Sequence, residues 1–170
     1  MTHKELVPIA YKWVMKAGSC GVAFREFKTL CSNGECPDIL GIRSGGHTVL
    51  IECKATRSDF LSDKNKKFRK NPQLGMGDFR FYLCPVGLIS KEELPLNWGL
   101  IYVSDNGKSR CIHNPYCKTA LGNIWGVNLH EKNYKAEQGF TYSALRRLYI
   151  KGHIECIYDK NYNRNFVEQF

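Results

Sequence analysis

Two short apolar runs, Asp38 to Arg43 and Thr48 to Lys54, flank the turn sequence Ser44-Gly45-Gly46. Runs rich in Ile, Leu and Val on either side of a glycine-containing turn are typical of a β-hairpin. The segment Val49-Leu50-Ile51 is apolar without interruption, which indicates a strand buried on both faces. The hairpin therefore belongs inside a sheet, and the rest of the chain must cover that sheet on both sides.

The remaining patterns predict an α/β protein with a mixed central sheet flanked by helices. Apolar residues at helical spacing predict an amphipathic helix over 4–17. We expect further strands at 22–31, 78–84, 100–103, 110–112 and 152–158, and further helices at 58–71 and 142–150. A chain of 170 residues is long enough for one full-sized domain.

The net charge of +9 favours a polyanionic partner. No apolar run approaches the ~20 residues that a membrane-spanning helix needs. Residues 1–16 alternate charged and apolar side chains and lack the apolar core of a signal peptide. We therefore expect a cytoplasmic protein that binds DNA rather than a membrane.

The hairpin brings charged residues together at one end. If Arg43 lies opposite His47, then Asp38 lies directly across from Glu52. Lys54 follows two residues later, so strand alternation places it on the same face. Facing carboxylates repel one another, and a bound divalent cation explains why two of them would be kept in apolar surroundings.

Hard oxygen ligands from Asp38, Glu52 and the backbone carbonyl of Cys53 suit Mg²⁺ or Mn²⁺. Such an ion polarises a phosphate and lowers the pKa of a bound water, and Lys54 can stabilise charge in the transition state. The simpler interpretation is a turn residue at Asp38 and an exposed ion pair between Glu52 and Lys54. The apolar flanks of Glu52 argue against it.

A basic stretch follows this strand directly. Neutralising backbone phosphates gives affinity without sequence readout. We therefore expect this stretch to contact nucleic acid, although a solvated helix face would show the same charges. The predicted nucleic-acid-binding residues are Arg57, Lys64, Lys66, Lys67, Arg69 and Lys70.

Pro37-Asp38 followed by Glu52-Cys53-Lys54 resembles the signature of the PD-(D/E)xK nuclease superfamily, the restriction-endonuclease-like proteins. The longer pattern is similar to the MmcB-related DNA-repair group; it runs through Ser58-Asp59-Phe60, Ser62-Asp63-Lys64, Phe81-Tyr82-Leu83, Pro85-Val86-Gly87-Leu88, Pro95 and Gly99-Leu100-Ile101. This chain has Asn65 where that group usually has an aromatic residue.

The resemblance covers roughly residues 26–103 and implies an αβββαβ core. We expect this core within 1–130, with a C-terminal helix and tail at 131–170 packed on the same domain. It implies Mg²⁺ dependence, DNA as the substrate, and catalytic roles for Asp38, Glu52 and Lys54. Members of the superfamily often carry a further acid upstream. Glu26 is the first candidate for it and Glu5 the second.

Three functions remain open from the sequence. The first is a Mg²⁺-dependent nuclease acting in DNA repair, recombination or phage and host DNA processing; a homodimer is one assembly that the sequence allows. The second is a catalytically silent DNA-binding module on the same fold. The third is a zinc-stabilised interaction protein built around Cys111, His113 and Cys117, although these lack the paired C-x2-C spacing of a strong zinc motif.

Overall fold

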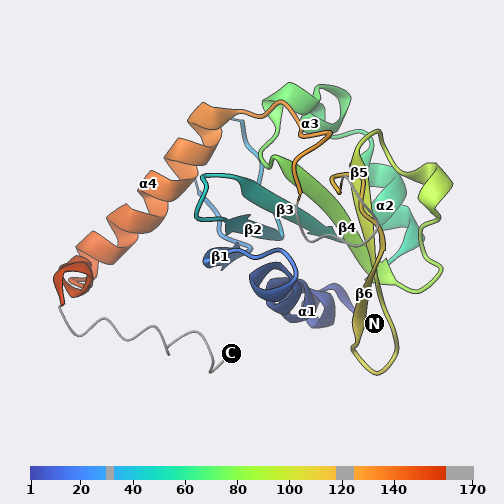
Figure 1. Cartoon of the computed structure of the whole chain (residues 1–170), viewed down its shortest axis with the longest axis horizontal. Helices are drawn as coiled ribbons and strands as arrows, with labels where there is room; N and C mark the ends of the chain where they lie inside the picture. Colours follow the sequence, from blue (N-terminus) through green and yellow to red (C-terminus); the bar gives the residue numbers. More distant parts are fainter. Residues whose placement is uncertain (30–32, 118–124, 160–170) are drawn as a thin grey trace.

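The computed structural model describes residues 1–29, 33–117 and 125–159. Within them six strands form one mixed sheet whose spatial order is the same as their order in the chain (Figure 1). The strands are β1 (Val22–Arg25), β2 (Ile39–Ile42), β3 (Thr48–Cys53), β4 (Phe79–Pro85), β5 (Trp98–Val103) and β6 (Ser109–His113). The β3–β4 and β4–β5 pairs are parallel, and the other three pairs are antiparallel.

The hairpin of β2 and β3 has the register that the sequence predicts. Ile39 pairs with Ile51 and Leu40 with Leu50, and the Arg43 N–H donates to the His47 carbonyl at 2.9 Å. Every residue of β3 is buried, as the uninterrupted apolar run predicts. This register fixes which side chains of β3 face each side of the sheet.

Helices cover both faces of the sheet. They are α1 (His3–Lys16), α2 (Arg57–Asp63), α3 (Lys67–Lys70) and α4 (Tyr134–Ile150), with 3₁₀ turns η1 (Pro72–Leu74), η2 (Lys91–Glu93) and η3 (Ile154–Tyr158). On one face α1 packs on Val49 and Ile51, and on the other Leu50 lies in a core shared with Phe60 of α2 and Phe140 of α4. The described chain is therefore a mixed α/β protein with a helix-flanked six-stranded sheet.

Helix α4 begins earlier than the apolar pattern of 142–150 predicts. The Asn133 side chain caps it by accepting from the Ala136 N–H at 3.0 Å. The ring of Phe140 packs edge-on against Phe24 and Phe27, which holds the first half of the helix on the sheet. The second half extends beyond the sheet (Figure 1). The last residues of the predicted tail, 160–170, lie outside the described residues.

Two predicted strands are wrong in extent or type. The strand expected over 22–31 ends at Arg25, because Glu26 adopts a left-handed backbone with φ of 43°; residues 30–32 lie outside the described part. The strand expected over 152–158 is instead the 3₁₀ turn η3. Among the residues that the structure describes, no helix is both long and apolar enough to cross a membrane.

The single helix expected over 58–71 is divided into α2 and α3. The chain leaves helical geometry at Lys66, whose φ and ψ are −62° and 140°. The Lys66 ammonium lies 2.7 Å from Asp63 and 3.3 Å from Glu52 of β3. Contacts with a buried strand thus override local helix propensity, a common outcome for short polar segments.

Candidate metal centre

Asp38 lies directly before β2, beside the C-terminal end of β3. We call this end of the sheet, where β2 begins and β3 ends, the edge. Its Oδ2 accepts a hydrogen bond from the Cys53 N–H at 2.7 Å, and its side chain is only 17% exposed. Burial, reinforced by the charge of Glu52, raises the pKa of Asp38 to about 6. The sheet thus holds an ionisable group in a place that disfavours its negative charge.

Two further side chains meet Asp38 at this edge. His3 Nε2 lies 3.4 Å from Glu26 Oε1 and 3.5 Å from Asp38 Oδ1. One atom from each of the three residues lies within 4.8 Å of the others, and no other such group of His, Cys, Asp or Glu occurs in the described residues. We call these three residues the edge triad.

The backbone explains why Glu26 belongs to the edge triad and Glu5 does not. The Glu26 N–H donates to the Asp38 carbonyl at 2.8 Å, which extends the pairing of β1 with β2 by one residue. Glu5 instead accepts from the Thr2 N–H at 2.7 Å in the capping box that begins α1. The first candidate for an upstream acid therefore lies beside Asp38, and the second is used for helix capping.

The Cys53 carbonyl also points toward this edge. The N–H and C=O of one residue in a strand point to the same neighbouring strand. The Cys53 N–H reaches Asp38, so its carbonyl points that way as well. The position opposite Cys53 in the hairpin register is Pro37, which has no N–H to donate. This carbonyl oxygen is consequently directed at the space that a ligand of Asp38 would occupy.

Glu52 and Lys54 lie together behind this edge, as strand alternation predicts. Lys54 Nζ lies 3.0 Å from Glu52 Oε2 and 2.9 Å from Asp63 Oδ1. Arg69 reaches three carboxylates: Nε lies 2.7 Å from Asp63, Nη1 lies 3.0 Å from Glu35 and Nη2 lies 3.0 Å from Glu52. We call this set of three acids and three bases the ion cluster; its members are Glu35, Glu52, Lys54, Asp63, Lys66 and Arg69.

The pKa values of Asp38 and Glu52 are shifted in opposite directions. Burial alone would raise the pKa of Glu52, but Arg69 and Lys54 hold it below its ordinary value. Asp38 titrates above its ordinary value. Pairs of carboxyl groups with separated pKa values are common in catalytic sites, although structural ion pairs also separate them.

One oxygen of Glu52 has no hydrogen bond. Oε1 lies 3.0 Å from Arg69 Nη2, close enough for an ion pair. The angles between these two atoms do not allow a hydrogen bond, and each is a buried polar atom without a hydrogen-bond partner in the described structure. A buried carboxylate oxygen left in this state has capacity for a further ligand.

The predicted basic residues divide into two groups. Arg57 forms an ion pair with Glu93. Lys66 joins the ion cluster with its side chain 41% exposed, and Arg69 is only 3% exposed, so Arg69 cannot reach a phosphate in this conformation. Lys64, Lys67 and Lys70 are exposed and form no ion pair with a described residue, whereas Arg57 and Lys66 are exposed but paired.

Sequence reasoning missed several residues of the ion cluster. Asp63 lies three positions after the buried Phe60 of α2, so helical periodicity places it on the buried side, where the Tyr82 hydroxyl donates to it at 2.7 Å. Glu35 and His3 carry no comparable signal, because each is joined to its partners only by the tertiary fold. The three zinc candidates Cys111, His113 and Cys117 form no group at ligand distance in the described residues.

No protein-family model matches the chain, and no curated protein matches it. Among solved structures, the fold is similar to that of the SPO1766 protein of unknown function from Silicibacter pomeroyi. The TM-score is 0.55, with 21% sequence identity over 98% of each chain. At this identity the likeness shows the fold alone.

Proposed function

We propose that this chain is a Mg²⁺- or Mn²⁺-dependent nuclease that hydrolyses phosphodiester bonds in DNA, on a restriction-endonuclease-like αβββαβ core. The proposal includes the resemblance to the PD-(D/E)xK superfamily and to its MmcB-related group. The order α1, β1, β2, β3, α2, β4 is compatible with such a core. A role in DNA repair, recombination or phage DNA processing follows from the same resemblance.

The observation that carries the proposal is the place of Asp38 against the end of β3. Its hydrogen bond to the Cys53 amide fixes one carboxylate beside the Cys53 carbonyl, at the edge where Glu26 also lies. Carboxylate and carbonyl oxygens are the ligands that Mg²⁺ and Mn²⁺ prefer. The proposal assigns Glu52 to the ion as a further carboxylate ligand; its Oε1 is buried, makes no hydrogen bond and lies 3.0 Å from Arg69 Nη2. The donor set therefore fits a hard divalent cation.

The proposal gives different residues of the site different roles in hydrolysis. Asp38, Glu52 and the Cys53 carbonyl would hold the ion, which supplies a Lewis acid for the phosphate and a water of lowered pKa. Lys54 is fixed by Glu52 and Asp63, so its charge is held in one place beside the reacting group. His3 contacts Glu26 and Asp38 and would orient them toward the ion.

The test is a panel of duplex, single-stranded, flap and junction DNA, with RNA as a further arm, incubated with Mg²⁺ or Mn²⁺. Asp38→Asn keeps an oxygen acceptor for the Cys53 amide, so we expect a folded protein with cleavage reduced by about 100-fold or more. The exposed Asp59→Asn is the matched control and should cleave like the wild type. Lys54→Met should also lose cleavage, with Lys135→Met as its control.

Calorimetric titration with Mg²⁺ completes the test. Wild-type protein should bind the ion, and Asp38→Asn should bind it at least tenfold more weakly. Cleavage that survives both Asp38→Asn and Lys54→Met in folded proteins would refute the proposal.

The second candidate function is a DNA-binding module that does not cut. Its support is the ion cluster, in which both oxygens of Glu52 already lie close to cations of the protein. DNA binding with steep salt dependence and no cleavage of any substrate with either ion would favour this function.

A further inference from the structure

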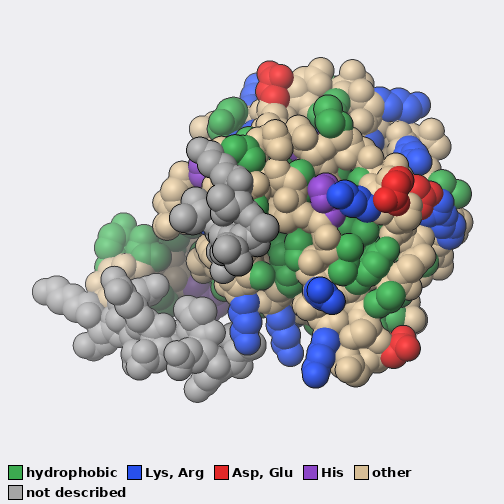
Figure 2. All heavy atoms as spheres, turned by 45° about the vertical axis from the view of Figure 1, so that its right-hand side comes forward, with side chains coloured by type: hydrophobic (Ala, Val, Ile, Leu, Met, Phe, Trp, Pro, Cys, Tyr) green, Lys and Arg blue, Asp and Glu red, His purple; other side chains and the backbone are tan. Residues whose placement is uncertain are grey.

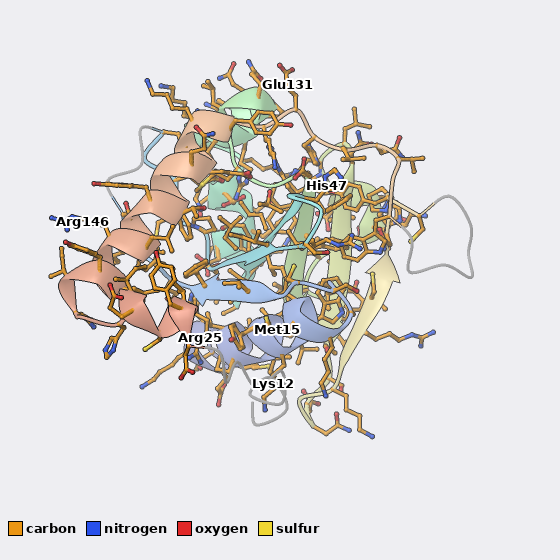
Figure 3. The ribbon with its side chains drawn as sticks, turned by 60° about the vertical axis from the view of Figure 1, so that its left-hand side comes forward. Lys12, Met15, Arg25, His47, Glu131 and Arg146 are labelled. Carbon is orange, nitrogen blue, oxygen red and sulfur yellow. The ribbon has the colours of Figure 1, made fainter. Side chains whose placement is uncertain are left out.

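A basic groove lies between α1 and the turn that joins β5 to β6. Its cavity has a volume of about 560 Å³. Lys12 and Lys16 of α1 line one wall, Lys108 lies on the other, and Trp13 and Ile9 form an apolar floor. Lys12 lies on the side of α1 that faces away from the sheet (Figure 3). On the face shown in Figure 2, Lys and Arg side chains gather along the lower edge, with hydrophobic side chains above them.

The lysines of this groove form no ion pair within the part of the chain that the structure describes. Lys12, Lys16 and Lys108 are exposed, and none of them forms an ion pair with another described residue. No Asp or Glu lines the cavity. By contrast, Arg69 and Lys66, which the sequence assigned to nucleic acid, neutralise buried carboxylates. The groove therefore offers a concentrated positive charge that a polyanion can neutralise.

The turn backbone and the apolar floor of the groove are held in place by contacts within the protein. The Gly107 N–H donates to the Ser104 carbonyl at 2.8 Å, and Gly107 has a φ of 78° that favours glycine. The floor residue Trp13 is 7% exposed and packs on Phe81 with ring centroids 5.0 Å apart. A preorganised surface loses less conformational entropy on binding than a flexible one.

Helix α1 connects this groove with the edge triad. His3 lies at its first turn, and Lys12 and Lys16 lie in its last two turns. At 1.5 Å per residue, the groove begins about 14 Å along the helix from His3 and ends about 20 Å from it. Each DNA strand carries a phosphate about every 3.4 Å, so this span corresponds to about four to six nucleotides.

We infer that this groove binds the sugar–phosphate backbone of DNA, about four to six nucleotides away from the bond held at the edge triad. The inference rests on the proposed function for the position of the scissile bond, but the groove itself can be tested without cleavage. Three lysines at the walls contact backbone phosphates. They give affinity and direction to the bound strand without reading its sequence.

The test measures binding of the full chain to a fluorescein-labelled 20-base-pair duplex. Fluorescence anisotropy reports the binding, in EDTA and at salt concentrations from 50 to 200 mM. The groove variant carries Lys12→Ala, Lys16→Ala and Lys108→Ala. The control variant carries Lys91→Ala, Lys135→Ala and Lys151→Ala, which removes the same charge from exposed positions away from the groove. Thermal unfolding verifies that both variants are folded.

We expect the groove variant to lower the slope of log affinity against log salt by about 2.7, which is about 0.9 for each phosphate that is no longer neutralised. Its affinity near 100 mM salt should fall by about 100-fold, and the control variant should change affinity by less than about fivefold. Equal losses in both variants would overturn the inference, because they would reflect net charge alone. A wild-type protein that does not bind DNA at 50 mM salt would overturn it as well.

A polyglutamate peptide serves as a competitor that lacks phosphates. If it binds as tightly as DNA and loses affinity in the same groove variant, the surface recognises acidic protein and the inference fails. Failure of the proposed function would look different. In that case the groove variant would still lose DNA binding selectively, while the wild type would cut no DNA with Mg²⁺ or Mn²⁺.

Discussion

Replacing Asp38 by asparagine should make the metal-free protein more stable at neutral pH. The Asp38 carboxyl is largely buried beside Glu52, and these two causes raise its pKa from an ordinary value of 3.8 to about 6. A carboxyl whose pKa is raised by folding is more easily ionised in the unfolded chain. Asparagine has a similar shape, can still accept from the Cys53 N–H, and carries no charge to desolvate.

The size of the effect follows from the shift in pKa. Each unit corresponds to about 1.36 kcal/mol, so a shift of about two units corresponds to about 3 kcal/mol. Because the folded-state pKa is the higher one, this contribution is fully present below pH 4 and is lost as the pH rises through 6. Asp38→Asn should therefore exceed the wild type by about 2–3 kcal/mol above pH 7, and the gap should close toward pH 4.

The measurement is urea unfolding in EDTA, repeated at pH values from 4 to 8. At this chain length, 2–3 kcal/mol corresponds to a rise in melting temperature of about 5–10 °C. Asp105→Asn, at an exposed turn position, is the control and should stay within about 0.5 kcal/mol of the wild type at every pH. A variant that is no more stable than the wild type at pH 8 would show that the Asp38 charge is better compensated than its burial indicates.

Divalent metal should reverse the order of stability. Binding to the folded state adds about 4.1 kcal/mol when the free ion is present at 1,000 times its dissociation constant, which exceeds the gap of about 2–3 kcal/mol between the two proteins. Only the wild type offers the ionised Asp38, so Mg²⁺ should raise its melting temperature and leave Asp38→Asn nearly unchanged. An equal rise in both proteins would place the ion elsewhere.

Two further substitutions test the packing and the ion cluster. Gly99→Ala should destabilise the protein by about 2 kcal/mol or more, because the added Cβ would overlap the buried ring of Phe81. Its control is Gly139→Ala, where the added Cβ meets open space on α4 and should raise the free energy of unfolding by about 0.5–1 kcal/mol. Arg69→Met should lower the free energy of unfolding by about 3–5 kcal/mol in urea, because three buried acids lose a shared partner. The control, Lys70→Met at an exposed position, should change it by less than about 0.5 kcal/mol. A small loss in Arg69→Met would show that its ion pairs only offset their own desolvation.

The hairpin could be predicted from the sequence because local and global signals agree there. The turn at Ser44-Gly45-Gly46 fixes the loop, and the apolar runs leave one register that buries both strands. Glu52 and Lys54 share a face because of strand alternation alone. Asp38 differs, since it lies before the first residue of β2 that pairs with β3, and its side chain turns to the Cys53 amide and His3.

The composition of the ion cluster could not be predicted from the sequence. Arg69 of α3 contacts Glu35, Glu52 and Asp63, and all three of these acids lie outside α3. A run of basic residues looks the same whether its side chains face solvent or buried acids. The break between α2 and α3 arises from those contacts, so a pattern read along the chain gives one helix instead of two.

Glu26 illustrates a case in which the residue was predicted and the geometry was not. The strand expected over 22–31 predicts an extended backbone at Glu26, but its backbone is left-handed, with φ of 43°. This conformation ends β1 and brings the carboxylate to His3 Nε2. A non-glycine residue in that region is held by its surroundings, and such residues are frequent at functional sites.

The positions of the charges within the fold favour different roles for Glu52 and Asp38, the two acids of the hairpin. In the ion cluster three acids and three bases cancel, so Glu52 is a fixed negative charge whose ionisation costs little further energy. Asp38 lies at the accessible edge and has few compensating cations, so its charge is the one that an arriving divalent ion would stabilise most. Since the ion cluster is neutral, the net charge of +9 must come from residues outside it. The positive surface that we propose binds DNA is therefore separate from the cations that hold Glu52 in place, and each can be changed without the other.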